Sequence, residues 1–409
     1  MNVEELVRES LREQAEQGGP VPGNFTDRVL AARRRRRNRT VAGASLVVAA
    51  ATVMAVAVPG LDGDSGRQET RTASELRDGD VVAHPGQTPP RDLIAAGGTA
   101  LAAYYTQKRV PQGKGVEISA RTYRLLDQRT GTYKKDARWS VLAVAPGMRM
   151  AAVLERELPA RRIGLLDMVT GKVERWIETP HGTGGVEFSP DGEKLVATTY
   201  EESPDRFDME HPMTDGKTTE PGPANPSRTG FYVIDVASGD SDWNAVKEES
   251  DEVGLPSINT RQDFGFSEDA SLVYSGLTSG KHPMQYYDLN GREVSAPAKE
   301  KHRHWVNEAG LSPSGKLLDG GFAGGARTTA SAILDPRTGK RVTKVPGQIL
   351  LAWADDKRLI AWDIASDGNE YRQRLVLVTV GSKKTVPLSG YRTGSLKSTG
   401  RWHPLFADR

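Results

Sequence analysis

The chain has 409 residues, of which 26% are charged and 37% hydrophobic, with a formal net charge of +2 at pH 7 and no cysteine. The lack of cysteine excludes disulfides, thiolate metal sites and thiol nucleophiles. Residues 1–40 contain nine arginines against six acids, so the rest of the chain has 46 basic against 47 acidic residues. A near-neutral remainder without a basic run predicts no nucleic-acid partner.

Residues 1–40 predict a short helical segment that ends in a cluster of arginines. Apolar residues recur at helical spacing in residues 2–16, and five consecutive arginines follow at Arg33–Arg37. Two interpretations stay open, a docking helix for a cytoplasmic partner or a weakly ordered tail against lipid headgroups. An isolated helix of this length is marginal in water, which favours the tail.

Residues 41–58 predict one transmembrane helix. The segment Val41–Val58 carries no charge, and only Ser45 and Thr52 have polar side chains. As a helix it is roughly 27 Å long, close to the ~30 Å hydrocarbon core of a bilayer. Arginines before it and an acidic excess in residues 61–80 place the N-terminus in the cytoplasm and the rest of the chain outside.

A cleaved signal peptide is the competing interpretation of the same segment. Ala55-Val56-Ala57 has the small residues of a cleavage site. The forty residues before the apolar run are much longer than a usual basic leader, which favours a retained signal-anchor. Residues 59–90, rich in Asp, Gly, Ser, Thr and Pro, predict an exposed linker.

From about residue 91 a two-part repeat indicates the fold. Its first half is an apolar strand, a tight turn and a second strand, clearest at residues 186–197. There, Pro190 presets the first corner of the turn and Gly192 occupies the left-handed position. Weaker copies begin at Ala96, Val144, Phe266, Leu311 and Trp353.

The second half is a strand that ends in aspartate, followed by a short turn containing glycine. The five clear copies are at Asp127, Asp167, Asp235, Asp288 and Asp335, and a degenerate sixth lies at residues 376–383. The aspartates are expected to accept hydrogen bonds from backbone N–H groups of their own turns, which is a scaffold role. Their spacings are 40, 68, 53 and 47 residues, and removing the polar insertion Glu201–Arg228 reduces the 68 to 40.

Four strands in each unit of about 45 residues predict an all-β fold, a β-propeller over residues 91–409. The repeats predict six blades, at about 91–138, 139–180, 181–250, 255–300, 301–346 and 347–390. Seven blades are the alternative if Tyr391–Arg409 forms more than a closing strand. We expect this tail to add a strand to the first blade, because that removes an open sheet edge.

Two resemblances accompany these patterns. The first-half copies, with Phe188-Ser-Pro-Asp-Gly192 as the best, resemble the repeat of Tol-type periplasmic propellers and their WD-repeat-like relatives over about residues 91–390. The Gly-His…Trp-Asp signature of WD repeats is absent, and Trp362-Asp363 falls within a predicted strand. The layout of residues 1–60 resembles actinobacterial membrane-anchored regulators, including anti-sigma factors, but lacks the His and Cys ligands of a zinc-binding head.

No catalytic motif is present. The chain has neither a G-x-S-x-G elbow nor a G-x-G-x-x-G loop, and Gly276–Lys281 is one residue short of a phosphate loop. His302 and His304, with His181 or His282 as a third ligand, form a candidate metal site, although a polar strand start is the favoured interpretation. Asp62-Gly-Asp64 and Asp367-Gly-Asn369 resemble calcium-loop fragments without the remaining ligands and predict turns.

The insertion Glu201–Arg228 is the candidate binding element, since loops carry binding on rigid scaffolds, with a disordered, tolerated insertion as the favoured alternative. The sequence thus predicts a non-enzymatic, single-pass membrane protein whose extracytoplasmic propeller binds a protein, peptide or envelope component. No catalytic, cofactor or metal residue is assigned. Two alternatives remain, a lactonase-like or lyase-like propeller enzyme with a metal in the central channel, and an anti-sigma-like transmembrane signalling protein.

Overall fold

A computed structural model describes residues 81–409, apart from 215–218, 226, 247–260, 277–283, 305, 326–328, 367–368, 370 and 393–400. The predicted cytoplasmic segment, the predicted transmembrane helix and most of the predicted linker lie outside the described residues. Every regular element in the described part is a strand. These residues therefore contain no helix of the length and hydropathy that crossing a membrane requires.

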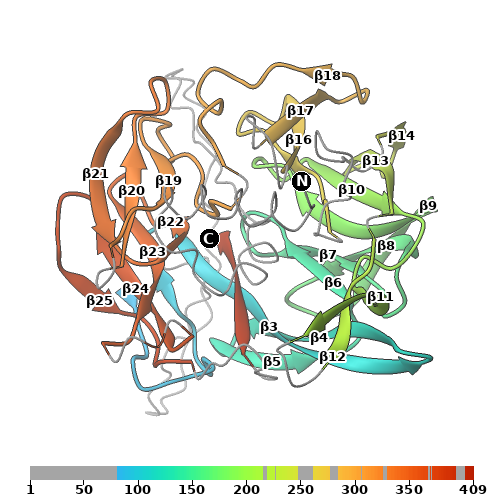
Figure 1. Cartoon of the computed structure of the whole chain (residues 1–409), viewed down its shortest axis with the longest axis horizontal. Helices are drawn as coiled ribbons and strands as arrows, with labels where there is room; N and C mark the ends of the chain where they lie inside the picture. The colour runs from blue at the N-terminus through green and yellow to red at the C-terminus, as the bar shows by residue number, and fades with distance from the viewer. Residues whose placement is uncertain are drawn as a thin grey trace, which may run out of the picture.

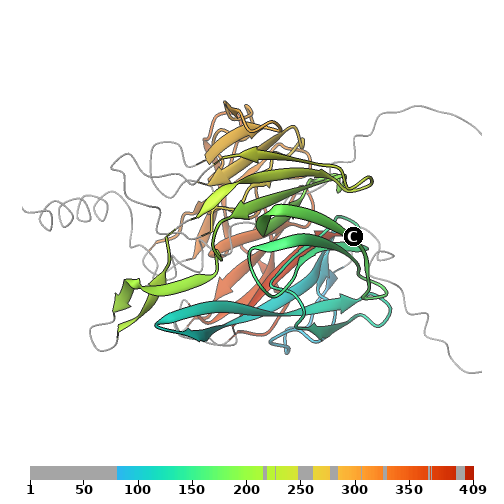
Figure 2. The same ribbon diagram turned by 90° about the vertical axis from the view of Figure 1, so that its right-hand side faces the viewer.

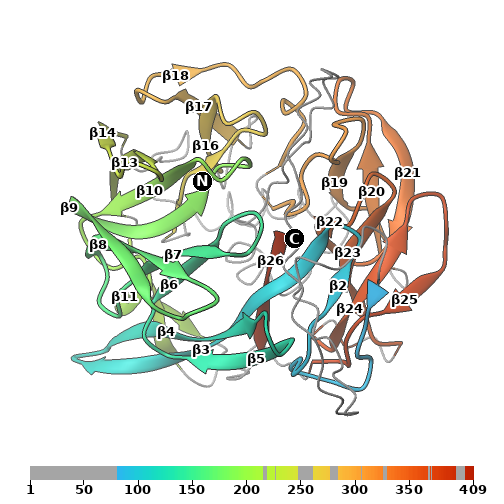
Figure 3. The ribbon, with the colours of Figure 1, turned by 180° about the vertical axis from the view of Figure 1, so that it is seen from behind.

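The strands form antiparallel sheets arranged around a common centre, where the C-terminal strand β26 lies (Figures 1 and 3). The largest sheet contains β1 (Val81–Val82), β2 (Ala95–Ala96), β3 (Thr99–Gly113), β4 (Val116–Asp127), β5 (Thr132–Asp136), β11 (Arg206–Thr214), β12 (Thr219–Pro223) and β26 (Trp402–Asp408). The next contains β6 (Val141–Val144), β7 (Met150–Leu154), β8 (Ala160–Asp167), β9 (Val173–Phe188), β10 (Lys194–Tyr200), β13 (Arg228–Asp235) and β14 (Ser241–Ala245).

Three smaller sheets complete the ring. They contain β15 (Gly265–Phe266), β16 (Leu272–Gly276), β17 (Met284–Asp288) and β18 (Glu293–Val294); β19 (Leu318–Phe322), β20 (Ala330–Leu334) and β21 (Arg341–Pro346); and β22 (Ile349–Trp353), β23 (Arg358–Ile364), β24 (Gln373–Thr379) and β25 (Thr385–Pro387).

These sheets are built from the four-strand unit that the repeat predicted. The seven-stranded sheet holds two units joined by β9, whose residues 173–178 pair with β8 and whose residues 183–188 pair with β10. The unit of β19, β20 and β21 has its innermost strand reduced to a bridge between Leu311 and Leu318. Antiparallel four-strand sheets succeeding one another around a centre are the architecture of a β-propeller, so the predicted fold is confirmed.

The ring is closed by both ends of the described chain. Strand β26 pairs with β3 from Trp402 opposite Thr106 to Asp408 opposite Thr99, which confirms the predicted role of the tail. Residues 81–96 make a second closure, because the His84 N–H donates to the Leu388 carbonyl at 2.9 Å, beside β25. Residues 81–90, which fall in the predicted linker, are therefore part of the ring.

The turn aspartates act as the sequence predicted. In the clearest case, the Asp167 Oδ1 accepts the N–H groups of Val169 and Thr170, both at 2.7 Å, and Gly171 has a φ of +70°. Hydrogen bonds from these backbone groups lower the pKa of the Asp167 carboxyl. The same side-chain-to-turn bonds occur at Asp127, Asp235, Asp288 and Asp335.

Alternating strand direction gives the ring two different faces. On one, the turn face, the connections from first to second and from third to fourth strand of each unit have only four to six residues. On the other, the loop face, lie the connections from second to third strand and from unit to unit. The longest of these connections are residues 201–227, 246–264, 295–310 and 388–401. Buried charged residues lie at the loop-face ends of several strands, and these strand ends position the candidate site.

Candidate binding face and pocket

An arm projects from the loop face. Strand β3 pairs with β26 only as far as Thr106, and its remaining residues continue outward, paired with β4. Strands β11 and β12 form a hairpin that adds to the same ribbon, with Phe207 opposite Glu117. Figure 2 shows this arm on the left, on the side away from the C-terminus. We define the arm as residues 107–120 with the described part of residues 206–223.

The arm corrects the favoured interpretation of the insertion. Most of residues 201–228 are described, and they form a paired hairpin rather than a disordered loop. Arg109 secures the hairpin, because its guanidinium carbon lies 4.0 Å from the ring centroid of Phe207 and its Nη1 donates to the Pro221 carbonyl at 2.8 Å. These contacts bridge about a hundred residues of chain, so no local pattern indicates them.

The outer edge of the arm discourages pairing with strands of other chains, while its surface offers apolar side chains to a partner. The edge strand β12 contains Pro221 and Pro223, which lack N–H donors and so discourage pairing with other exposed strands. Strand β11 exposes two large apolar side chains, Met209 at 47% and Met213 at 41%. Flexible thioether side chains adapt to irregular partner surfaces.

A buried ionic network anchors the base of the arm. The carboxylate of Asp205 accepts two hydrogen bonds from Arg121, at 2.5 and 2.8 Å, and two from Arg261, at 2.7 and 2.8 Å. All three side chains are buried. Burial alone would raise the pKa of the Asp205 carboxyl, but the charges of both arginines hold that pKa well below its usual range.

The network extends into neighbouring units. The Nη1 of Arg261 also donates to the Gly184 carbonyl at 2.8 Å and to Asp263 at 3.1 Å. Asp263 in turn accepts a hydrogen bond of 2.6 Å from the Tyr200 hydroxyl. Since Arg121 belongs to β4, Tyr200 to β10 and Arg261 to the segment before β15, the insertion joins distant units at the loop face.

A pocket of about 190 Å³ opens between the segment before residue 309, strand β19 and the start of β22. Its lining residues are His304, Val306, Asn307, Glu308, Asp319, Gly320, Gly321, Phe322, Gln348, Ile349 and Leu350. None of these described lining residues is Lys or Arg. The pocket therefore combines two carboxyl groups, two amides and an apolar wall.

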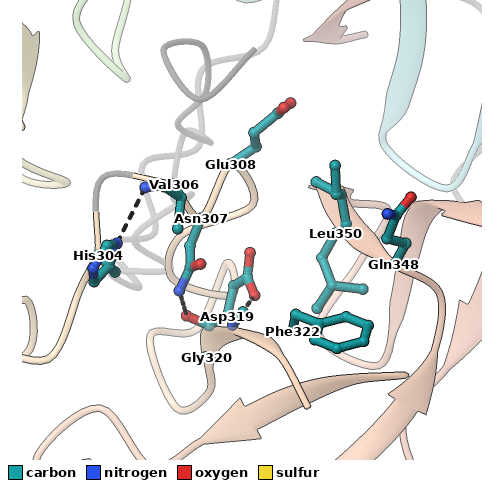
Figure 4. Close-up of a pocket in the computed structure, with 11 residues that line it drawn as sticks. His304, Val306, Asn307, Glu308, Asp319, Gly320, Phe322, Gln348 and Leu350 are labelled. Carbon is teal, nitrogen blue, oxygen red and sulfur yellow. Dashed lines mark hydrogen bonds between the residues drawn. The ribbon is translucent and has the colours of Figure 1, made fainter. Parts of the chain in front are cut away.

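Asp319 is the most buried ionisable group in this pocket, with 1% of its surface exposed. Its side chain lies between Asn307 on one side and Leu350 and Phe322 on the other (Figure 4). The Oδ1 accepts the Gly321 N–H at 2.9 Å. Burial nevertheless raises the pKa of the Asp319 carboxyl to about 7, so half of these groups are neutral near physiological pH.

The backbone around Asp319 is held in place by Asn307. The Asn307 Nδ2 donates to the Asp319 carbonyl at 2.9 Å, and this bond is buried. Gly321 adopts a φ of +74°, and a Cβ atom there would lie 2.6 Å from the Asn307 Oδ1. Glycine is thus required at 321 for two reasons, conformation and space. The sequence contains no motif that marks Asp319, which follows the weak repeat copy at Leu311.

The histidines of the candidate metal site have separate surroundings. His302 and His304 lie outside the regular strands, so the favoured interpretation of a strand start was wrong. His304 lines the pocket, His302 lies beside Gly339, and His181 stacks on Trp243 at 3.8 Å between ring centroids. Within the described ranges, no three His, Asp or Glu residues are grouped to hold a metal ion. His282 lies outside those ranges.

Comparisons with known proteins find similarity in fold. The chain is similar to the crystal structure of TolB from Acinetobacter baumannii, with 16% identity, 75% of this chain and 67% of that chain covered, and a TM-score of 0.41. It is also similar to the Cps50 (Swd1) β-propeller domain of Myceliophteria thermophila, with 13% identity, 69% and 89% covered, and a TM-score of 0.37. No family model matches the chain. No curated protein matches it either.

Proposed function

We propose that the protein is a membrane-anchored, non-enzymatic, six-bladed β-propeller that binds a protein or peptide of the cell envelope through its loop face. The observation that carries this proposal is the asymmetry between the two faces. Loops on a rigid scaffold are where binding residues concentrate. Here the arm, the buried ionic network and the pocket are all on the loop face.

The turn face, by contrast, is occupied with holding the blades together. The Nη1 of Arg175, near the start of β9, donates to the carbonyls of Ala237 and Ser238 in a turn of the next unit, at 3.0 and 3.1 Å. The N–H of Ser314 donates to Asp356, also in a neighbouring unit, at 2.7 Å. Short turns that bond to each other leave few groups available to recognise a partner.

The location of the propeller rests on the amino-acid sequence. The uncharged segment Val41–Val58 with its preceding arginines supports a retained signal-anchor, a cytoplasmic N-terminus and an extracytoplasmic propeller. Protease added to intact cells should digest residues 81–409. Protection of the propeller, together with its recovery in the cytosolic fraction, would refute this location.

Site-directed cross-linking tests the binding face directly. Because the chain has no cysteine, a single introduced cysteine carries a photo-cross-linker to one known position. Lys108→Cys places it on the exposed part of the arm, and Lys172→Cys places it on an exposed turn-face position as the matched control. We expect a discrete cross-linked species from Lys108→Cys alone. Equal products from both positions, or none from either, would contradict the proposal.

One observation favours the enzyme alternative. A buried carboxyl with a pKa of about 7 is suited to general acid–base catalysis, and Asp319 is such a group. Screening the full chain against lactones and polysaccharide lyase substrates tests this alternative. Turnover that Asp319→Asn abolishes would establish an enzyme and displace the binding proposal.

The signalling alternative concerns residues 1–40. If ligand binding outside alters a cytoplasmic helix, these residues should retain a specific cytoplasmic protein in a pull-down experiment. A version with Arg33–Arg37 replaced by glutamines serves as the control for adhesion through charge alone. If no specific protein is retained, the signalling alternative is rejected and only the binding role remains.

A further inference from the structure

We propose that the pocket between β19 and β22 binds the basic side chain, lysine or arginine, of a protein held at the loop face. This inference rests on the proposed function for the origin of that side chain. It goes beyond that function by naming the chemical group that the partner must present. Three properties of the pocket carry it, namely its charge, its walls and its place on the ring.

The charge of the pocket suits a cation. Asp319 and Glu308 both line it, and the described lining residues include no lysine or arginine. The guanidinium of Arg303, whose charge acts on Asp319, is buried and paired with Glu300 at 3.3 Å between Nη1 and Oε2. An incoming ammonium or guanidinium group would therefore meet the carboxylate of Asp319, whose attraction is strengthened by the low dielectric of the site.

The walls of the pocket suit an aliphatic stem that ends in a charge. Val306, Ile349 and Leu350 supply apolar surface, and the Phe322 ring is 42% exposed at the same opening. Lysine and arginine bury their methylene groups along such surface while the charged end reaches polar partners. An aromatic ring at the entrance adds a cation–π attraction to the charged end of such a side chain.

These walls also argue against a metal ion. Hard cations such as Ca²⁺ require six to eight oxygen ligands at short distance. The described residues offer no group of three His, Asp or Glu side chains for this purpose. Six of the eleven lining residues are apolar or glycine, so they offer an ion no side-chain ligand, whereas the apolar ones give a side-chain stem a surface to contact.

Binding of a cation in this pocket should depend on pH, because Asp319 must lose its proton first. Its carboxyl must ionise to pair with a cation, and burial raises its pKa to about 7 in the empty pocket. Binding should therefore weaken about tenfold when the pH falls from 8 to 6. The other titratable residues that line the pocket are Glu308 and His304, and the charge of Arg303 acts against the rise in the pKa of Asp319.

The experiment measures binding of small probes to the full chain in detergent micelles by saturation-transfer NMR. The probes are Nα-acetyl-lysine N-methylamide and its uncharged analogue Nα-acetyl-norleucine N-methylamide. We expect the lysine probe to bind at least tenfold more tightly than the norleucine probe. Asp319→Asn should weaken lysine-probe binding at least tenfold, while Asp240→Asn, the same change on the exposed turn face, should leave it unchanged.

Several results would overturn the inference. They are equal binding of the two probes, unchanged binding to Asp319→Asn, and displacement of the lysine probe by millimolar calcium chloride, which would assign the pocket to a metal. Phe322→Ala provides a second test that keeps both acids, and it should weaken the lysine probe several-fold. Thermal unfolding of each variant checks that the fold is retained.

The two proposals fail in different ways. If the lysine probe does not bind but Lys108→Cys still gives its cross-linked species, the pocket inference is wrong and the loop-face function stands. If the probe binds as expected but no loop-face position gives a cross-linked species, the proposed function is wrong and the pocket inference stands for the probe alone. Loss of the Lys108→Cys product in the Asp319→Asn background would support both together.

Discussion

The turn face and the loop face are made from the two ends of the same strands, yet they hold their residues by different means. On the turn face, each aspartate bonds to backbone groups two to four residues away, as Asp167 does with Val169 and Thr170. On the loop face, Asp205 is held by Arg121 and Arg261, which are 84 and 56 positions away in the chain. One face is stabilised locally and repeatedly, whereas the other depends on single long-range contacts.

This difference indicates how the ring combines stability with a binding surface. Repeated local turns can lose one member without loss of the ring, because each contributes a small and independent amount. A buried carboxylate between two guanidiniums is harder to replace, because removing it takes from Arg121 the carboxylate with which it pairs and reduces the pairing of Arg261 to Asp263. The loop face should thus be more sensitive to single substitutions than the turn face, and its binding elements should be separable from ring closure.

Loss of ring closure should lower the stability of the protein more than any substitution on either face. Truncation after Ser389 removes β26 and with it the buried side chains of Trp402, Leu405 and Phe406. Each contributes about 1.5–3 kcal/mol by burial, so the loss approaches the whole stability of an ordinary domain. We expect a strongly lowered melting temperature by circular dichroism. An unchanged melt would show that β26 does not close the ring.

Asp205→Asn should give the largest effect of any single substitution at the loop face. The amide cannot neutralise Arg121 and Arg261, so the free energy of unfolding should fall by about 3–5 kcal/mol. Urea unfolding measures this value. The control is Glu202→Gln, which breaks the exposed ion pair with Arg206 and should cost less than about 1 kcal/mol. Similar losses for the two variants would contradict the contrast between the faces.

Asp319→Asn should stabilise the protein, and only at neutral to alkaline pH. A folded-state pKa raised from 3.8 to about 7 means that Asp319 destabilises the fold increasingly as the pH rises through this interval. Well below pH 3.8 the carboxyl is neutral in both the folded and the unfolded state, so its burial has no effect on the pH dependence of stability there. The stability gained by the variant should grow by up to about 4 kcal/mol between pH 4 and pH 8. A gain that is independent of pH would refute the raised pKa.

A turn-face glycine should show a smaller and purely local effect. Gly171 has a φ of +70° and open space where a Cβ would stand, so Gly171→Ala costs only backbone strain, about 1–2 kcal/mol. Gly86→Ala is the matched control, since its site is equally open and its φ lies outside the left-handed region. Chemical denaturation should separate the two variants. A loss above about 3 kcal/mol at Gly171 would mean that the turn face is not tolerant of single changes.

The smallest expected change in stability is on the arm, where binding should change instead. Replacing Met209 and Met213 by serine removes exposed apolar surface and should alter the free energy of unfolding by less than about 0.5 kcal/mol. The cross-linked species from Lys108→Cys should nevertheless decrease. If the double variant instead unfolds at a lower denaturant concentration and gives the same yield of cross-linked species, the two methionines stabilise the fold and do not contact the partner.

The amino-acid sequence by itself determined the repeated strands, the turns and the closing tail. Asp167 and its four equivalents were recognisable because their bonds span only a few residues, and such interactions leave a periodic pattern in the chain. The closing strand followed from the same period, since a propeller with an incomplete first unit retains an open edge. The transmembrane helix at residues 41–58 stays a prediction from the same source.

Only the tertiary structure decided where the insertion lies and which residues meet in the pocket. Arg206 and Phe207 of β11 pair with β4, and Asp205 contacts Arg121, because the ring brings units that are distant in sequence together at the loop face. Asp319 shares a pocket with Glu308 and Leu350 for the same reason. Local periodicity encodes strands and turns, whereas contacts between units depend on how the closed ring places them, and no short pattern records that geometry.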